Sequence, residues 1–267
     1  MSILFSGDFH ANARGELTLL TNDTLLNKFG AEIYSNVNYH IILGDGGFGW
    51  ENNEKRDKYN YKKLAERSFP ILVVQGNHEP IYGMKNVKEI DIGIGEKVLV
   101  INKKPFTAYL KRGNIYTIDG IKFLVLGGAL SIDKYRRTEN KSWWKNEYWS
   151  DKEKKDLFEL LEKNNSFDCI ISHTGPWHIN VKLFHYSYPL SIGGNYEKIN
   201  DKVAKLNDEI HEKIYFNEWW CGHFHQNLYY YDSDKNRGYQ YLYKSTKILE
   251  KNLDRITVFN EHGMMKR

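Results

Sequence analysis

Five short apolar runs, each followed closely by side chains that can bind a metal ion, constrain the fold of this chain more than any other feature. The runs span residues 3–6, 40–43, 71–75, 169–172 and 219–221. They are rich in β-branched and aromatic residues and are bounded by turn-forming or polar residues, which predicts buried strands. The polar residues that follow the runs are Asp8, His10, Asp45, Asn77, His78, His173, His223 and His225.

The segments between these runs predict helices and further strands. Helical candidates occur at about residues 17–29, 55–67, 151–164 and 198–214. The third candidate begins after Ser150, and Glu153 completes a capping box with it, in which each side chain satisfies a free backbone N–H. Two hairpins are also predicted, one around the turn Asp119-Gly120 and one around the polar turn at residues 232–238.

The order of these elements indicates the fold class. Strands and helices alternate through the first eighty residues, which predicts parallel strand pairing. The second half is richer in strands, which suggests a second sheet packed on the first. We therefore predict a mixed α/β (α+β) fold in which a two-sheet β-sandwich is flanked by helices. Residues 1–267 are expected to form a single domain, with a loop or cap inserted at the polar, aperiodic segment 133–149.

The charge balance and the apolar runs limit the classes of partner. The 38 basic residues are scattered among 34 acidic ones for a net charge of +4, and no basic block is dense enough to indicate a nucleic-acid surface. The balance mildly favours an anionic substrate. No stretch approaches the roughly 20 apolar residues of a membrane helix, and the N-terminus lacks the pattern of a signal peptide. We predict a cytoplasmic protein with no membrane contact.

The two cysteines are isolated from each other and from any CxxC pair. Cys169 and Cys221 each lie in an apolar run beside a candidate metal-binding histidine. Two such thiols do not make a disulfide framework. They are interpreted as core residues of a reducing compartment, with metal binding as the alternative.

The polar residues after the five runs predict a metal site. Ligands bind beyond the carboxyl ends of the strands in open α/β sheets, so these loops are expected to meet at one edge. Carboxylate, imidazole and amide oxygen together suit two divalent cations, manganese foremost, with iron or zinc as alternatives. Asp45 is the natural bridging carboxylate. The spacings Asp8-x-His10 and His223-x-His225 predict that each pair lies on one face of an extended segment.

A family resemblance rests on the order of five motifs between residues 8 and 225. The motifs are Asp8-x-His10, Gly44-Asp45, Gly76-Asn77-His78-Glu79, His173 and Gly222-His223-x-His225. One such motif is weak evidence, whereas all five in order are specific. The chain resembles the calcineurin-like metallophosphoesterase superfamily, which includes phosphoprotein phosphatases, phosphodiesterases, nucleotidases and repair nucleases. The resemblance implies a four-layer αββα arrangement and hydrolysis of a phosphoester.

The resemblance also implies a role for each motif residue. The residues expected to bind the first metal ion are Asp8, His10 and His225. Those expected to bind the second are Asn77, His173 and His223, with Asp45 bridging both ions. A hydroxide between the metals would attack phosphorus. His78 would act as the catalytic residue that stabilises the transition state or protonates the leaving group.

The chain departs from the phosphoprotein phosphatases at two places. Their GDxxDRG motif has an aspartate that orients the catalytic histidine, but Phe48 occupies that place here. Pro80 follows Glu79, so both arginines that grip a phosphomonoester in those enzymes are absent. The stretch at residues 172–176 is closer to the phosphodiesterase-type members. Glu79 is a candidate for orienting His78, although as its neighbour it could equally point away.

Two groups of residues near the 133–149 segment have open interpretations. Arg136 and Arg137 are candidate substrate-binding residues, because an arginine can donate two parallel hydrogen bonds to a phosphate. The alternative is a solvated surface pair. The aromatic residues of the segment either stack a base or anchor a loop on the domain, and they are Trp143, Trp144, Tyr148 and Trp149.

Three functions are consistent with this sequence. The first is a phosphoesterase that acts on a phosphomonoester or phosphodiester of a small or nucleotide-like molecule. The second is a DNA or RNA nuclease of the same superfamily, which is less favoured because such members usually add a DNA-binding or coiled-coil extension. The third is a non-catalytic metal-binding scaffold, but scaffold members typically lose ligand histidines and every ligand position is filled here.

Overall fold

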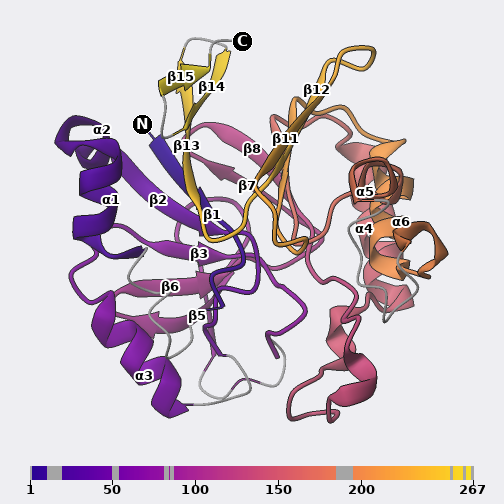
Figure 1. The fold of residues 1–267 in the computed structure, drawn as a ribbon, viewed down its shortest axis with the longest axis horizontal. Coiled ribbons are helices and arrows are strands. Elements are labelled where there is room, and N and C mark those ends of the chain that lie inside the picture. The colour runs from indigo at the N-terminus through magenta and orange to yellow at the C-terminus, as the bar shows by residue number, and fades with distance from the viewer. Residues whose placement is uncertain are drawn as a thin grey trace.

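Two β-sheets face each other in the computed structural model, and helices cover the outer face of each (Figure 1). The structure describes residues 2–10, 20–49, 54–80, 84, 87–184, 195–252, 255–260 and 263–265. Among these residues, the first sheet has nine strands in the order β15-β14-β13-β1-β2-β3-β6-β5-β4. The second has six strands in the order β11-β12-β10-β9-β8-β7.

The strands and helices have the following bounds. The strands of the first sheet are β1 (Ser2–Ser6), β2 (Val37–Ile42), β3 (Ile71–Val73), β4 (Lys88–Ile90), β5 (Val98–Lys103), β6 (Phe106–Tyr109), β13 (Thr246–Asn252), β14 (Arg255–Asn260) and β15 (Gly263–Met265). Those of the second are β7 (Asn114–Ile118), β8 (Ile121–Val125), β9 (Cys169–Ile171), β10 (Glu218–Cys221), β11 (Leu228–Asp232) and β12 (Arg237–Tyr241). The α-helices are α1 (Asn22–Phe29), α2 (Ala31–Ser35), α3 (Glu54–Lys63), α4 (Asp151–Lys163), α5 (Trp177–Phe184) and α6 (Lys202–His211). The short 3₁₀ helices are η4 (Lys134–Arg136), η5 (Lys145–Glu147) and η7 (Tyr196–Lys198).

Parallel pairing dominates the centre of both sheets. In the first sheet, β1, β2, β3 and β6 run parallel to one another. In the second, β8, β9, β10 and β12 do the same. The parallel order of the first strands and both hairpins, β7–β8 and β11–β12, confirm the sequence-based predictions. Because parallel strands end at the same edge, the loops after β1, β2 and β3 lie together, as do those after β9 and β10.

The apolar core has an inner layer and two outer ones. The inner core lies between the sheets and includes Phe5, Phe123 and Trp220, all fully buried. The Phe5 and Trp220 rings, one from each sheet, are 4.6 Å apart at their centroids. Burial on this scale removes apolar area from water on both inner faces, which is the main force that holds the two sheets together.

The outer layers join each sheet to its own helices. Leu64 of the α3 region packs against the first sheet with Ile42 and Val73, and Leu25 of α1 packs with Leu4. On the other side, α4 and α6 cover the second sheet through a cluster that contains Leu157, Leu206 and Ile170, among others. Helices α1 to α3 and α4 to α6 therefore lie on opposite sides of the molecule (Figure 1). The predicted αββα layering is confirmed.

The ends of the helices follow local capping. The predicted capping box is present at α4, where Ser150 accepts from the Glu153 backbone N–H and Glu153 reaches back to the Ser150 backbone. The helix predicted at 198–214 begins at Lys202, because the Asp201 side chain accepts from Val203 N and Ala204 N, 3.0 Å each. In the part of the chain that the structure describes, no helix has the length and apolar character that crossing a membrane would require.

Neither cysteine forms a disulfide, and both are fully buried. Cys169 belongs to the core between the sheets, and Cys221 to the core between the second sheet and its helices. Burial holds the pKa of the Cys221 thiol well above its ordinary value, so the thiol is protonated and inert. The interpretation of both residues as core side chains is confirmed.

Candidate metal centre

The predicted metal-binding residues all lie in loops that follow central parallel strands. Asp8 and His10 follow β1, Asp45 follows β2, and Asn77 and His78 follow β3. The second sheet contributes the others from the loops after β9 and β10, namely His173, His223 and His225. Residues that are up to 217 positions apart in the sequence therefore meet at one place (225 − 8 = 217).

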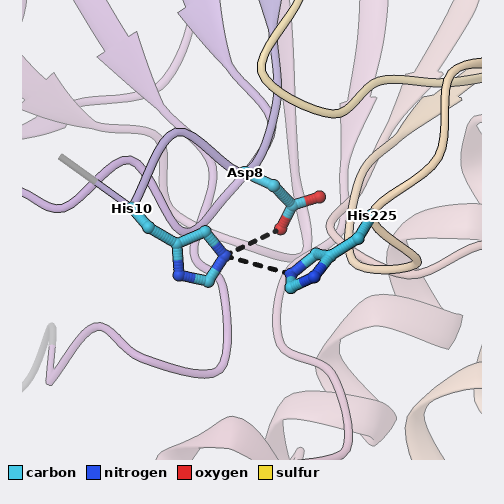
Figure 2. Close-up of side chains that lie close together, drawn as sticks. All are labelled: Asp8, His10 and His225. Carbon is cyan, nitrogen blue, oxygen red and sulfur yellow. Dashed lines mark hydrogen bonds and ion pairs between the residues drawn. The ribbon is translucent and has the colours of Figure 1, made fainter. Parts of the chain in front are cut away.

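Asp8, His10 and His225 form one compact group (Figure 2). His10 Nε2 lies 3.7 Å from Asp8 Oδ1 and 3.2 Å from His225 Nε2. One atom from each side chain lies within 4.8 Å of the others. Two imidazole nitrogens that face each other beside a carboxylate oxygen need a cation or a shared proton between them. This group can hold a divalent metal.

Asp45 is the carboxylate at the centre of the site. Its Oδ2 lies 3.9 Å from His10 Nε2 and 3.4 Å from His173 Nε2, so it faces both predicted metal positions. His173 Nε2 in turn lies 3.1 Å from Asn77 Oδ1. Asp8 Oδ1 is 3.8 Å from the same His173 nitrogen. A central carboxylate with ligands on both sides has the arrangement that a bridging position requires.

Two buried polar atoms at the site have no hydrogen-bond partner among the described residues. They are Asp8 Oδ1 and His223 Nε2. The rest of each side chain is held in place: the His223 backbone N–H donates to Asp8 Oδ2 at 2.5 Å, and the His223 ring packs edge-on against His173. Leaving a buried polar atom unpaired costs about 1–3 kcal/mol, which a bound cation would offset. The donor set therefore fits divalent metal binding.

The charges of the site also indicate that a cation belongs there. Burial raises the pKa of Asp45, but His78, His173 and His10 outweigh it and hold that pKa well below its ordinary value. Burial lowers the pKa of His173, but Asp45 and Asp8 raise it well above 6.5. A proton on His173 thus compensates the buried carboxylates. Metal binding would displace such a proton, since a ligating histidine must be neutral.

Contacts around the candidate ligands orient the atoms that would face a metal ion. His173 Nδ1 donates to the Leu43 carbonyl at 2.7 Å, so Nε2 is the nitrogen that would bind a metal once the metal displaces its proton. The Tyr243 ring stacks on His225 with centroids 4.6 Å apart and planes at 19°. Such outer contacts set the tautomer and orientation of metal-binding histidines.

The backbone at the ligands is left-handed, so the prediction of extended Asp8-x-His10 and His223-x-His225 segments is wrong. The φ angles are 51° at Asp8 and His10, 48° at Asp45, 71° at His223 and 52° at His225. For residues with a Cβ this conformation costs roughly 1–2 kcal/mol each. The loops leave the strands at once, and the paired side chains converge through the tight turn instead of through strand alternation.

Gly44 and Gly76 are required because the loops approach one another closely. A Cβ on Gly44, which has φ +78°, would lie 2.4 Å from His173 Nδ1. A Cβ on Gly76 would lie 2.1 Å from Asp45 Oδ1 and 2.7 Å from Glu79 Oε2. The glycines of the two motifs therefore leave room for the ligands of the neighbouring loops.

We expect Gly44→Ala to weaken metal binding more than its backbone cost alone explains, because the new methyl group pushes His173 away from Leu43. Gly120→Ala is the matched control, since Gly120 has φ +74° and a Cβ there meets nothing within 4 Å. Gly120→Ala is expected to lose about 1 kcal/mol of unfolding free energy from its backbone alone, and Gly44→Ala is expected to lose more. Titration with Mn²⁺ should show reduced affinity for Gly44→Ala only, and equal affinity in both variants would contradict this account.

Glu79 connects the two loops that carry Asp45 and Asn77. This buried carboxylate accepts from the backbone N–H groups of Gly76 at 2.7 Å, Gly46 at 2.9 Å and Asp45 at 3.2 Å. Burial and the Asp45 charge raise the pKa of Glu79 to about 8. Its oxygens face the backbone of the Asp45 loop, so the idea that Glu79 orients His78 is wrong. Its contribution is to hold Asp45 in place.

The Arg137 guanidinium contacts the His78 ring. Its Nη1 and Nη2 atoms lie 2.8 Å from His78 Nδ1 and Nε2, and Nη2 is also 2.7 Å from Asp133 Oδ1. His78 Nε2 lies 3.7 Å from Asp45 Oδ2. Burial lowers the pKa of His78 to about 4; the Asp45 charge opposes this change and the Arg137 charge adds to it. The imidazole is therefore neutral near pH 7.

Of the two predicted substrate-binding arginines, the structure brings only Arg137 to the site. Arg136 is exposed, with its guanidinium 5.1 Å from the ring centre of the adjacent Tyr135. The aromatic residues of the 133–149 segment are mostly buried, with Trp143, Trp144 and Trp149 only 6–7% exposed. They anchor the segment, so the alternative in which these rings stack a base is wrong.

Comparisons with known proteins identify the fold. A model of the calcineurin-like phosphoesterases matches residues 1–227. GAP50, the anchor in the inner membrane complex of Plasmodium, superposes with a TM-score of 0.53 at 12% identity, over 97% of this chain and 83% of its own. A dimetal phosphatase from Danio rerio superposes with a TM-score of 0.51 at 12% identity, over 99% and 96%. A search of curated proteins returns no match.

The family match covers every loop that carries a candidate ligand, from Asp8 to His225. The structural similarity is low in sequence identity and shows the fold alone, but it agrees with the same assignment. The chain belongs to the calcineurin-like phosphoesterase family.

Proposed function

We propose that this protein is a phosphoester hydrolase that requires two divalent cations and acts on a phosphomonoester or phosphodiester of small or nucleotide-like size. The observation that carries the proposal is the convergence of five loops around Asp45, with two buried ligand atoms left unpaired. Asp8 and His223 combine an unpaired buried atom with left-handed backbone, two costs that metal binding would offset.

The ligand assignment follows the two sides of Asp45. In our proposal, the first cation is held by Asp8, His10 and His225, and the second by Asn77, His173 and His223, with Asp45 bridging. Nitrogen and oxygen donors without thiolate favour manganese, with iron or zinc as alternatives. When bound, the cations supply Lewis acidity to the phosphoryl group and activate the attacking water.

His78 and Arg137 supply the remaining polar groups on the substrate side. A neutral imidazole has one N–H and one lone pair, so only one of its two contacts with Arg137 is a hydrogen bond at a given moment. In our proposal, the ring N–H of His78 donates to a phosphoryl or leaving oxygen once the substrate replaces one of these two Arg137 contacts. With a pKa of about 4, His78 acts as a neutral hydrogen-bond donor that stabilises the transition state, not as an imidazolium acid.

Metal-dependent hydrolysis of p-nitrophenyl phosphate and bis-(p-nitrophenyl) phosphate tests the proposal. We expect the metal-depleted protein to be inactive and Mn²⁺ to restore turnover of at least one ester, with two metal ions per chain by elemental analysis. The ratio of the two rates reports the mono- or diester preference. Two bound metals with no turnover of either ester would reject generic phosphoesterase activity and support a scaffold role.

Arg137→Ala is expected to lower kcat/KM by about 10- to 100-fold, because a charged hydrogen bond to a phosphoryl oxygen contributes about 1.5–3 kcal/mol. Removing the guanidinium also removes a positive charge beside His78, which favours the protonated ring. The pKa of His78 should therefore rise above its value of about 4 in the metal-free protein, as NMR titration of the ring would report. Arg136→Ala is the matched comparison, and a larger loss for Arg136 than for Arg137 would contradict the assignment.

A further inference from the structure

The side chain of Asn77 is held from behind by two residues that the family motifs do not contain. Asn77 Nδ2 donates to Ser131 Oγ at 3.0 Å, and Ser131 Oγ donates to Glu147 Oε2 at 2.5 Å. Ser131 is 2% exposed, Glu147 1% and Asn77 5%. The three side chains form a buried chain of hydrogen bonds that ends at the metal centre.

The direction of donation in this series of hydrogen bonds is set by the chemistry of the Glu147 and Asn77 side chains. A carboxylate only accepts hydrogen bonds, so the single hydroxyl proton of Ser131 is committed to Glu147. The Ser131 oxygen can then only accept from its other neighbour, which must be the NH₂ group of Asn77. The amide oxygen of Asn77 consequently points the other way, toward His173 Nε2 at 3.1 Å. That oxygen is the atom that suits a divalent cation.

The segment that carries Glu147 is itself fixed to the sheet loops. The Asn146 carbonyl accepts from Gln75 Nε2 at 2.9 Å and from Arg112 Nη1 at 2.8 Å. A Cβ on Gly128 would lie 2.1 Å from the Glu147 carbonyl oxygen, so the two backbones are in close contact. Glu147 is thus held rigidly where Ser131 can reach it.

We propose that Ser131 and Glu147 are positioning residues, which hold the Asn77 amide with its oxygen toward the second metal. This inference rests on the proposed function, in which Asn77 is a ligand of that metal. It adds that one N–H of the Asn77 amide is committed to Ser131. His78 and Arg137 supply polar contacts on the substrate side. The side chains of Asn77 and His78, which are adjacent in the sequence, are therefore both positioned by residues of the 131–149 region.

Calorimetric titration of the metal-free protein with Mn²⁺ tests the inference. Ser131→Ala is expected to weaken the second binding step by about 10- to 100-fold, the usual effect of removing an outer contact of a metal ligand, and to leave the first step unchanged. Ser131→Thr retains the hydroxyl and should restore the second step. Thr107→Val is the matched control, since it removes a buried hydroxyl that donates to the Pro105 carbonyl. Thr107 pairs with Ile71 at the start of β3, whereas Gln75 follows the end of that strand.

A second variant tests the direction of donation from Asn77 through Ser131 to Glu147 without deleting a contact. Glu147→Gln can either donate to or accept from Ser131, so the Asn77 amide is free to rotate, and a loss smaller than that of Ser131→Ala is expected. Second-step affinity equal to wild type in Ser131→Ala would overturn the positioning role. A wild-type protein that binds fewer than two metals would instead overturn the two-cation proposal, and the positioning role with it.

Discussion

Asp45→Asn is expected to abolish metal-dependent hydrolysis and to reduce the bound metal from two ions to one or none. Asp45 Oδ2 faces His10 on one side and His173 on the other, so its charge serves both positions. A loss of about 4 kcal/mol of transition-state stabilisation lowers kcat by roughly 10³-fold, and we expect at least this much. The change is nearly isosteric, so the fold should survive. Steady-state kinetics and elemental analysis of the same preparation give both quantities.

The control for this substitution is Asp208→Asn. Asp208 also pairs with a histidine, His178, at 2.6 Å, but on α5 and α6 away from the metal centre. Its replacement should leave kcat and metal content unchanged. Full metal content and near wild-type kcat in Asp45→Asn would exclude a bridging carboxylate at this position.

His78→Ala is expected to lower kcat by about 10²- to 10⁴-fold while both metal ions remain bound. The loss should appear in kcat because the hydrogen bond from His78 strengthens only as charge develops on the phosphoryl group. The metal content carries additional information, because His10, Asp45 and His78 also lie close enough together to hold an ion. A drop in bound metal on His78→Ala would make His78 a ligand and not a catalytic residue.

The pH dependence of His78 gives a second readout of its role. With a pKa of about 4, the ring stays neutral as the pH rises through 6.5, so its protonation does not change in that range. The pH dependence of kcat between pH 5.5 and 7.5 should therefore have the same shape in the wild type and in His78→Ala. His178→Ala removes a half-exposed histidine away from the site and controls for the loss of an imidazole.

The sequence predicted that the candidate ligand residues lie together, because their positions follow from the ends of strands. Asp8, Asp45 and His173 each follow a buried apolar run, and parallel pairing brings such ends to one edge without further information. The order of the layers follows from the same alternation. These features depend on local pattern and on topology rules, both of which can be read from one chain.

Other parts of the site could not be predicted, because they depend on how loops cross. The φ angles at Asp8 and His225 are left-handed, so the side chains there do not follow the alternating directions expected of an extended strand. The contact of Arg137 with His78 and that of Ser131 with Asn77 depend on the path of an aperiodic segment. Glu79 was visible in the sequence, but the direction of its carboxylate was decided by three backbone N–H groups from neighbouring loops.

The fold alone does not decide between catalysis and anchoring. The similar structures include both a protein described as an anchor and one described as a dimetal phosphatase. Function must therefore be argued from the site, since one fold hosts many activities. In this chain the argument depends on Asp8 and His223, where an unpaired buried atom and left-handed backbone occur in the same residue.

The left-handed turns at the candidate ligands create a conflict between the stability of the fold and metal binding. At Asp8, His10, Asp45, His223 and His225 glycine would relieve the backbone strain, at roughly 1 kcal/mol per position, but would delete a ligand. Stability alone would favour glycine at these five positions. The cost of keeping the side chains is one that metal binding would offset. In a metal-free protein, glycine should strengthen the fold at these five positions, as it should at Asp119, Asn140, Asn236 and Lys244, but only at the five site positions should it also weaken metal binding.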